Sequence, residues 1–207
     1  MQMAQPNSKN NQLHWIPADL PIVDFKEELI KDFNPNFVAT TARAFQSQRL
    51  TVVTENYKIS TWIENLTDSQ KKLKEYIEKF LPFDEVINIK INNPIRAGGM
   101  HYDLVDKNCN KELLDHHLGL EPSGYRLVLT GNKSNDLIVK VKGIPIQTVV
   151  PDTTDWYILG HAITPHCLKK VDTDRLIVFC HGWINQEKHK DLLARSIEKY
   201  SQYAIYG

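Results

Sequence analysis

Hydrophobic residues recur along the chain with two different periods, helical towards both ends and strand-like between them. Apolar residues three or four positions apart predict helices over residues 24–33, 36–48, 69–80 and 185–203. The best defined of these has Leu73, Tyr76, Ile77 and Phe80 along one face, and Pro82 ends it.

Between residues 84 and 185 the pattern is typical of short β-strands. Residues 85–93 alternate strictly, with Ile87, Ile89 and Ile91 on one face and Asn88 and Lys90 on the other. Further strands, each bounded by Pro, Gly or Asp, are predicted within residues 125–136, 137–143, 144–150, 155–160 and 175–184, with a strand and turn over 49–60.

This order of elements predicts a mainly β fold with flanking helices (α+β). Strands that follow one another without intervening helices exclude a doubly wound parallel sheet and favour a sandwich or barrel, with the helices packed on one outer face. We expect a flexible N-terminus over residues 1–13 and a single domain over residues 14–207, since 207 residues suffice for one core.

Charge and composition narrow the class of partner. Lysine plus arginine equals aspartate plus glutamate at 25 each, so the zero net charge argues against a nucleic-acid partner. There is no apolar run long enough for a membrane span and no signal-peptide pattern, and three cysteines without framework spacing indicate reduced thiols. We therefore expect a cytoplasmic protein.

The chain contains two His-x-Asp triplets, and their surroundings distinguish them. The second, His189 to Asp191, lies in a predicted helix, where residues two apart face roughly opposite ways, so it is interpreted as a solvated helix face. The first, His101 to Asp103, follows a predicted strand and turn. In an extended chain its imidazole and carboxylate project from the same face.

Two later histidines, His161 and His166, are candidates to complete a triad with the first triplet. Two imidazoles and one carboxylate on one face of an octahedron leave three coordination positions open, which suits non-haem Fe(II). Arg175 stands nine positions after His166 and fourteen after His161. The residues by themselves leave open which of the two histidines is the third ligand.

The motif His101-x-Asp103, sixty-two intervening residues, His166 and then Arg175 resembles that of the 2-oxoglutarate- and Fe(II)-dependent oxygenases. The resemblance covers about residues 84–185, and it implies a double-stranded β-helix (jelly-roll or cupin-like) core. It implies the ligand set His101, Asp103 and His166, because the family has its arginine nine or ten positions after the distal histidine. His161 is then left with a supporting or substrate-facing role, or is a partly exposed loop histidine. It further implies Fe(II), 2-oxoglutarate as co-substrate and O₂, with oxidation of a substrate C–H bond. Arg175 would then bind the far carboxylate of 2-oxoglutarate, because a guanidinium matches a carboxylate in two-pronged geometry.

The sequence also departs from better-known branches of that family. Ile177 replaces the serine or threonine expected two residues after the arginine, so a second oxoglutarate contact is sought on other strands. The candidates are Asn88, Lys90, Tyr125 and Arg126. His181 stands where nucleic-acid demethylases have a further arginine, which argues against base repair.

Residues near the mouth of the predicted barrel are the candidates for substrate contact: Arg96, Trp156 and His161. His116 and His117 are interpreted as a surface pair in a lid or loop. We expect a small metabolite or amino-acid derivative as substrate. The alternatives are an aspartyl/asparaginyl-type protein hydroxylase, a cupin-like metal protein that does not use 2-oxoglutarate, and a binding domain without chemistry. The sequence leaves the oligomeric state and the identity of the substrate open.

Overall fold

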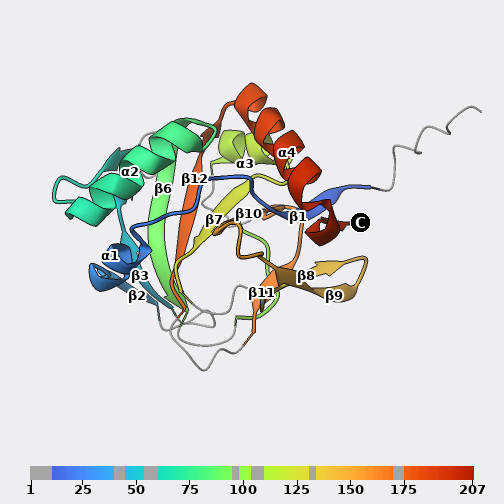
Figure 1. Cartoon of the computed structure of the whole chain (residues 1–207), viewed down its shortest axis with the longest axis horizontal. Coiled ribbons are helices and arrows are strands. Elements are labelled where there is room, and N and C mark those ends of the chain that lie inside the picture. Colours follow the sequence, from blue (N-terminus) through green and yellow to red (C-terminus); the bar gives the residue numbers. More distant parts are fainter. Residues whose placement is uncertain are drawn as a thin grey trace, which may run out of the picture.

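The computed structural model describes residues 11–39, 45–53, 60–94, 98–103, 110–130, 134–169 and 175–207 (Figure 1). It is mainly β, with a few helices, and its strands pair in antiparallel sheets. The predicted α+β class with flanking helices is therefore confirmed. Among the described residues, none of the helices is long and apolar enough to cross a membrane.

A large antiparallel sheet runs through the molecule. Its order is β13 (Ile205–Tyr206), β1 (Leu13–Pro17), β10 (Trp156–Leu159), β7 (Gly124–Val128), β12 (Ile177–Ile184), β6 (Phe83–Pro94), β3 (Phe45–Arg49) and β2 (Phe37–Ala39). A smaller sheet has the order β11 (His166–Leu168), β8 (Ser134–Val141) and β9 (Ile144–Val149), and β4 (Thr51–Val53) pairs with β5 (Ser60–Trp62).

The chain passes back and forth between the large and the small sheet. After β6 it reaches an isolated bridge of His101 with His166 of β11, then enters β7 of the large sheet, β8 and β9 of the small sheet, and β10 of the large sheet. It returns to the small sheet at β11 and then enters the large sheet again at β12. Segments far apart in sequence are thereby brought to the space between the two sheets.

The helices are α1 (Lys26–Lys31), α2 (Asp68–Phe80), α3 (Lys111–Leu118) and α4 (Gln186–Tyr200), and a 3₁₀ turn follows at Ser201–Tyr203. Buried residues of α1, α2 and α4 pack on one face of the large sheet, as predicted. Helix α3 instead packs against β12, and its His117 reaches His161 and His181, on the opposite face. A capping box between Thr67 and Gln70 begins α2. Figure 1 shows α2 and α4 along one side of the large sheet, with β8, β9 and β11 on the other.

Each face of the large sheet has its own hydrophobic cluster. The helix-side cluster joins Leu73 and Ile77 of α2 to Ile89 and Ile91 of β6, and the predicted alternation of β6 is confirmed. The second cluster, which includes Trp15 and residues of β8, fills the space between the two sheets. The polar residues of β6 share this second face.

Three stretches differ from the prediction. Residues 36–48 do not form a helix: the described parts are β2 and β3, whose pairing with each other and with β6 outweighs a weak helical spacing. The expected loop with His116 and His117 contains α3, which Asn110 caps. Strand β1 lies inside the N-terminal part that had no predicted element.

Candidate metal centre

Backbone pairing brings the first triplet against the distal histidine. The amide of His101 donates to the carbonyl of His166 (3.0 Å), and the amide of His166 donates back to His101 (2.9 Å). Two residues on, the amide of Asp103 donates to the carbonyl of His161 (2.8 Å). Because alternate residues of an extended chain share a face, the side chains of His101 and Asp103 both project towards β11.

The three predicted ligands converge on one point. Asp103 places Oδ1 3.6 Å from Nε2 of His101 and Oδ2 3.6 Å from Nε2 of His166. Their ligand atoms all lie within 4.8 Å of one another. Ligands about 2.1 Å from a common metal at right angles would lie about 3.0 Å apart. Both distances from Asp103 therefore exceed the spacing of a bound metal by roughly half an ångström.

Hydrogen bonds fix both imidazoles in the orientation that ligation requires. Nδ1 of His101 lies 2.8 Å from the carbonyl oxygen of Gly99, and Nδ1 of His166 lies 2.9 Å from that of Thr164. A carbonyl oxygen only accepts, so each Nδ1 carries the proton and donates it. The lone pair is then on Nε2, the nitrogen that faces Asp103, as in metal-binding histidines whose other nitrogen is anchored. The donor set fits a divalent metal.

Arg126 of β7 holds the carboxylate of this group. Its Nη2 donates to Oδ2 of Asp103 (2.8 Å) and lies 3.0 Å from Nε2 of His181, and its Nη1 donates to the carbonyl of Tyr125 (2.8 Å). Burial opposes ionisation, but the contact with His166 and the charge of Arg126 hold the pKa of Asp103 well below its ordinary value. Asp103 is thus an anion at neutral pH. Arg126 was predicted to contact 2-oxoglutarate; among the described residues its guanidinium contacts Asp103, His181 and the carbonyl of Tyr125.

A second group of potential ligands shares the same carboxylate: Asp103, His161 and His181. A metal ion there would lie beside the guanidinium of Arg126, which keeps its charge in proteins and already contacts Nε2 of His181. Burial, and then the charge of Arg126, hold the pKa of His181 well below its ordinary value. In this second group the guanidinium of Arg126 already supplies the positive charge that a metal ion would bring. The first group, His101, Asp103 and His166, is therefore the candidate metal centre.

His161 lies directly behind Asp103 and is fully buried. Neither of its ring nitrogens has a hydrogen-bond partner among the described residues, and Nε2 lies 3.6 Å from Oε1 of Glu121. Burial lowers the pKa of His161, and it raises that of Glu121 to about 8. The ring packs against Gly124, where a Cβ atom would come within 2.3 Å of Nδ1. The supporting or substrate-facing role expected for His161 stays a prediction.

The expected co-substrate residues lie on the same sheet face as the centre. The pairing of β7 with β12 continues to Leu176, so alternation puts Arg175 on the face of Phe179 and His181, with 2% of its surface exposed. Lys90 pairs with Phe179 and Asn88 with His181, which places both on this face. Tyr125 points the other way, into the helix-side cluster, so its expected oxoglutarate contact is wrong.

Other expected roles are also corrected. Trp156 lies in the helix-side cluster, where it stacks on Tyr76 at a centroid distance of 5.7 Å, so the large sheet separates it from the centre and its expected substrate contact is wrong. His189 is not solvated: it is buried against Tyr125 and the carbonyl of Leu120. Arg96 lies outside the described residues.

The sequence analysis did not predict that His117 and His181 lie beside the candidate metal centre. His117 is not a surface residue: it is fully buried, with Nδ1 2.9 Å from the hydroxyl oxygen of Ser123 and Nε2 3.1 Å from the carbonyl oxygen of Gly182. Its ring centroid lies 4.9 Å from that of His161. The role of His181 was missed too, although alternation from the apolar Cys180 already places it on the polar face of β12.

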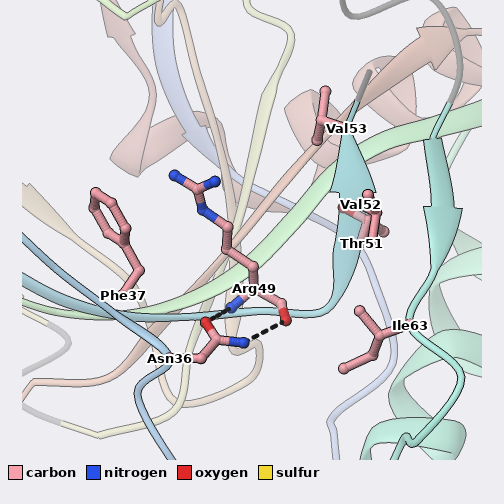
Figure 2. Close-up of a pocket in the computed structure, with 7 residues that line it drawn as sticks. All are labelled: Asn36, Phe37, Arg49, Thr51, Val52, Val53 and Ile63. Carbon is pink, nitrogen blue, oxygen red and sulfur yellow. Dashed lines mark hydrogen bonds between the residues drawn. The ribbon is translucent and has the colours of Figure 1, made fainter. Parts of the chain in front are cut away.

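A groove lies apart from the predicted ligands, at the β2 end of the large sheet. It has a volume of about 350 Å³ and is lined by Asn36, Phe37, Arg49, Thr51, Val52, Val53 and Ile63. Figure 2 shows both hydrogen bonds of the Asn36 amide to the backbone of Arg49, and the Arg49 guanidinium between Phe37 and Val53. None of the predicted metal ligands lines this groove.

Comparison with known proteins finds only a weak similarity to solved structures. No family model and no curated protein matches the chain. Among solved structures, an oxidoreductase of the 2OG-Fe(II) oxygenase family from Burkholderia pseudomallei is 15% identical, with a TM-score of 0.47, covering 77% of this chain and 78% of that one. A prolyl-4-hydroxylase from Pseudomonas putida is 12% identical, with a TM-score of 0.44, covering 82% and 93%. Similarities at this level do not establish a function for this chain.

Proposed function

We propose that this chain is an Fe(II)- and 2-oxoglutarate-dependent oxygenase that oxidises a C–H bond of a small substrate. The observation that carries the proposal is the group His101, Asp103 and His166, with both Nε2 atoms directed at one ionised carboxylate. The passage of the chain between a large and a small antiparallel sheet supports a double-stranded β-helix as its core. The centre lies between those sheets.

This set of three ligands suits a catalytic iron ion better than a structural metal ion, whose coordination positions are all filled by protein side chains. Two imidazoles and one carboxylate leave coordination positions for other molecules, and His101 and Asp103 each keep 18% of their side-chain surface exposed. Bound iron(II) with 2-oxoglutarate would supply the oxidising chemistry, in which O₂ is consumed and the keto acid is decarboxylated to succinate and carbon dioxide. The chain itself has to hold the ligands, keep Asp103 charged and orient the co-substrate.

Four side chains divide that work. Arg126 keeps Asp103 ionised and in place through a charge-assisted hydrogen bond. Arg175, buried on the face of the centre, is the residue that we assign to the far carboxylate of 2-oxoglutarate. Asn88 and Lys90 lie on the same face, and we assign them to the remaining polar contacts of the co-substrate. This use of Arg175 separates the proposal from a cupin-like metal protein, which would have no need of that cation.

The test is turnover of 2-oxoglutarate without added substrate. Succinate would be measured with Fe(II) and O₂ for the wild type, for His166→Ala, for Arg175→Gln and for a control, Arg195→Gln, which changes an exposed arginine of α4. We expect succinate from the wild type and the control, none from His166→Ala, and an at least thirtyfold higher KM for 2-oxoglutarate in Arg175→Gln. Equal KM values in the two arginine variants would refute the role of Arg175. Tight iron binding without any turnover would favour the cupin-like alternative.

A further inference from the structure

Strand β2 presents an exposed apolar edge at one end of the large sheet. It is last in the strand order, and within the described ranges it pairs with β3 alone. Its sequence is Phe-Val-Ala, whereas edge strands are commonly protected by charged residues or proline. Phe37 and Val38 keep 38% and 54% of their surface exposed. An exposed apolar edge of this kind is a template for the addition of a further strand.

The edge strand β9 of the small sheet differs in this respect. It contains Pro145, and proline has no N–H to donate to a further strand. Because β2 contains no proline and no charge, it is the better suited of these two edges to pair with another segment.

A groove that carries one positive charge adjoins the edge of β2. Its volume is about 350 Å³, and its apolar walls are Phe37, Val52, Val53 and Ile63. Arg49 of β3 supplies the charge, and its guanidinium lies 4.5 Å from the ring centroid of Phe37 (Figure 2). The charge therefore extends over the edge strand itself. Val52 is 59% exposed, so the groove is open to solvent.

The charge of Arg49 suits an acidic partner. In the part of the chain that the structure describes, Arg126 pairs with Asp103 and Arg195 with Asp19, whereas the guanidinium of Arg49 contacts the Phe37 ring and no carboxylate. A guanidinium has five N–H donors in a planar fork, which match a carboxylate in two-pronged geometry. Arginine and aromatic side chains are also enriched in protein interfaces.

A segment added to β2 would direct alternate side chains to this groove. Neighbouring strands lie about 4.8 Å apart, and residues two positions apart share a face. A side chain beside Phe37 would lie next to the guanidinium of Arg49. The groove lies at the Asn36 end of β2, so the side chain two positions along would lie over the apolar wall of Val52 and Val53.

We propose that β2 and the adjoining groove bind an extended segment of a partner protein by strand addition. The segment carries an acidic residue, whose carboxylate pairs with Arg49, and an apolar residue two positions away, whose side chain fills the groove. The β2 strand of a second copy of this chain has no acidic residue and does not meet this requirement. None of the predicted metal ligands lines the groove, so the proposal does not rest on the oxygenase function.

Calorimetric titration of the full-length chain with short blocked peptides tests the proposal. The two probes are acetylated and amidated heptapeptides, Thr-Val-Glu-Thr-Leu-Val-Thr and Thr-Val-Leu-Thr-Glu-Val-Thr, which carry the acidic and the apolar residue in either order. Matched peptides replace the glutamate by glutamine or the central threonine by proline, and glutarate is the free small acid. We expect one probe to bind at least about tenfold more tightly than its glutamine and proline counterparts.

Two variants of the chain test the same contacts from the protein side. Arg49→Gln should bind the glutamate and glutamine peptides equally, because the charge that distinguishes them is gone. Val52→Thr should weaken binding of the probe about fivefold, since it removes an apolar contact. Arg195→Gln on α4 and Ile144→Thr on β9 change exposed residues elsewhere and are the matched controls, which should bind like the wild type. Circular dichroism would establish that all four variants fold.

Several outcomes would overturn the proposal. It fails if neither probe binds, if the glutamine peptides bind as tightly as the glutamate peptides, or if Arg49→Gln retains the difference between them. It also fails if glutarate binds as tightly as the probes, because the groove would then be a small-molecule site. If the free chain sediments as a dimer that the probe dissociates, a second copy covers β2 and the proposal is wrong.

Discussion

Two pairs of histidines approach the same carboxylate, and the structure treats them differently. His101 and His166 donate Nδ1–H to backbone carbonyls and direct Nε2 at Asp103. His161 and His181 lie on the far side of Asp103, with Nε2 of His181 beside Arg126. We call His101 and His166 the outer pair, and His161 and His181 the inner pair. Residue type alone would make either pair a metal site; anchoring and local charge distinguish them.

The two pairs also differ in exposure to solvent, and the outer pair is the more exposed. The outer pair retains a path to solvent through His101, whereas His161 is fully buried and His181 is 7% exposed. A metal centre that binds a co-substrate and O₂ needs open positions, and the outer pair provides them. In the inner pair, His181 lies beside Arg126, which gives the carboxylate its charge and position, and His161 packs behind that carboxylate.

The largest expected effect comes from removing the charge of Arg126, which lies beside the inner pair. Arg126→Met would leave the carboxylate of Asp103 without its charged partner, and we expect the free energy of unfolding to fall by about 3 kcal/mol. Urea denaturation of the metal-free chain measures this loss. Arg195→Met removes an exposed arginine that pairs with Asp19 and should cost less than about 1 kcal/mol. Equal losses would mean that Arg126 has no special role at the centre.

The second prediction compares the two pairs as ligands. Four-ligand zinc sites bind with about 10–16 kcal/mol, so one ligand is worth about 3 kcal/mol, or more than a hundredfold in affinity. His166→Ala should therefore weaken metal binding by at least about a hundredfold. His181→Ala, which acts through Arg126, should weaken it by about tenfold or less. Anaerobic titration with Fe(II), or with Co(II) as a spectroscopic probe, would measure both affinities. A larger loss in His181→Ala than in His166→Ala would reverse our assignment of the metal ligands.

Sequence reasoning found the outer pair and missed the function of the inner one. His101, Asp103 and His166 belong to a spacing pattern, and a hydrogen-bonded bridge is all that is needed to bring them together. The contact of Arg126 with Asp103 depends on how the segment after β6 lies against β7, which no local pattern encodes. The sequence indicated Arg126 only as a contact of the co-substrate, and its contact with Asp103 was not predicted.

The same contrast holds for the fold. Helix α2 and the alternation of β6 were predictable, because each has a strong period over many residues. Residues 36–48 were not, since the short strands β2 and β3 owe their conformation to pairing at the sheet edge. His117 belongs to a helix of eight residues, too short for its buried face to show in the hydrophobic pattern.

A third prediction concerns pH and the buried surroundings of the inner pair. Burial lowers the pKa of His117, which touches His161, to about 3. The unfolded chain takes up this proton near the ordinary pKa of about 6.5, so stability is full above that pH and falls as the pH decreases towards 3. His117→Gln should reduce the slope of stability against pH by about 1.4 kcal/mol per unit between pH 6 and pH 4. Urea midpoints at several pH values would give that slope, and identical slopes would contradict a neutral buried His117.

The smallest effect tests why a glycine precedes Tyr125. A Cβ atom at Gly124 would come within 2.3 Å of Nδ1 of His161, so Gly124→Ala has to displace a buried ring. We expect it to lower the free energy of unfolding by about 1 kcal/mol, as overpacking does. Alanine is otherwise better than glycine in a strand, because it loses less backbone entropy on folding.

The sign of that effect should therefore depend on the inner histidine. In a His161→Ala background the ring is gone, and Gly124→Ala should become neutral or stabilising by a few tenths of a kcal/mol. A double-mutant cycle on urea midpoints would measure the coupling directly. If Gly124→Ala costs the same with and without the imidazole, then the inner histidine is not packed against Gly124, and its assigned place behind Asp103 is wrong.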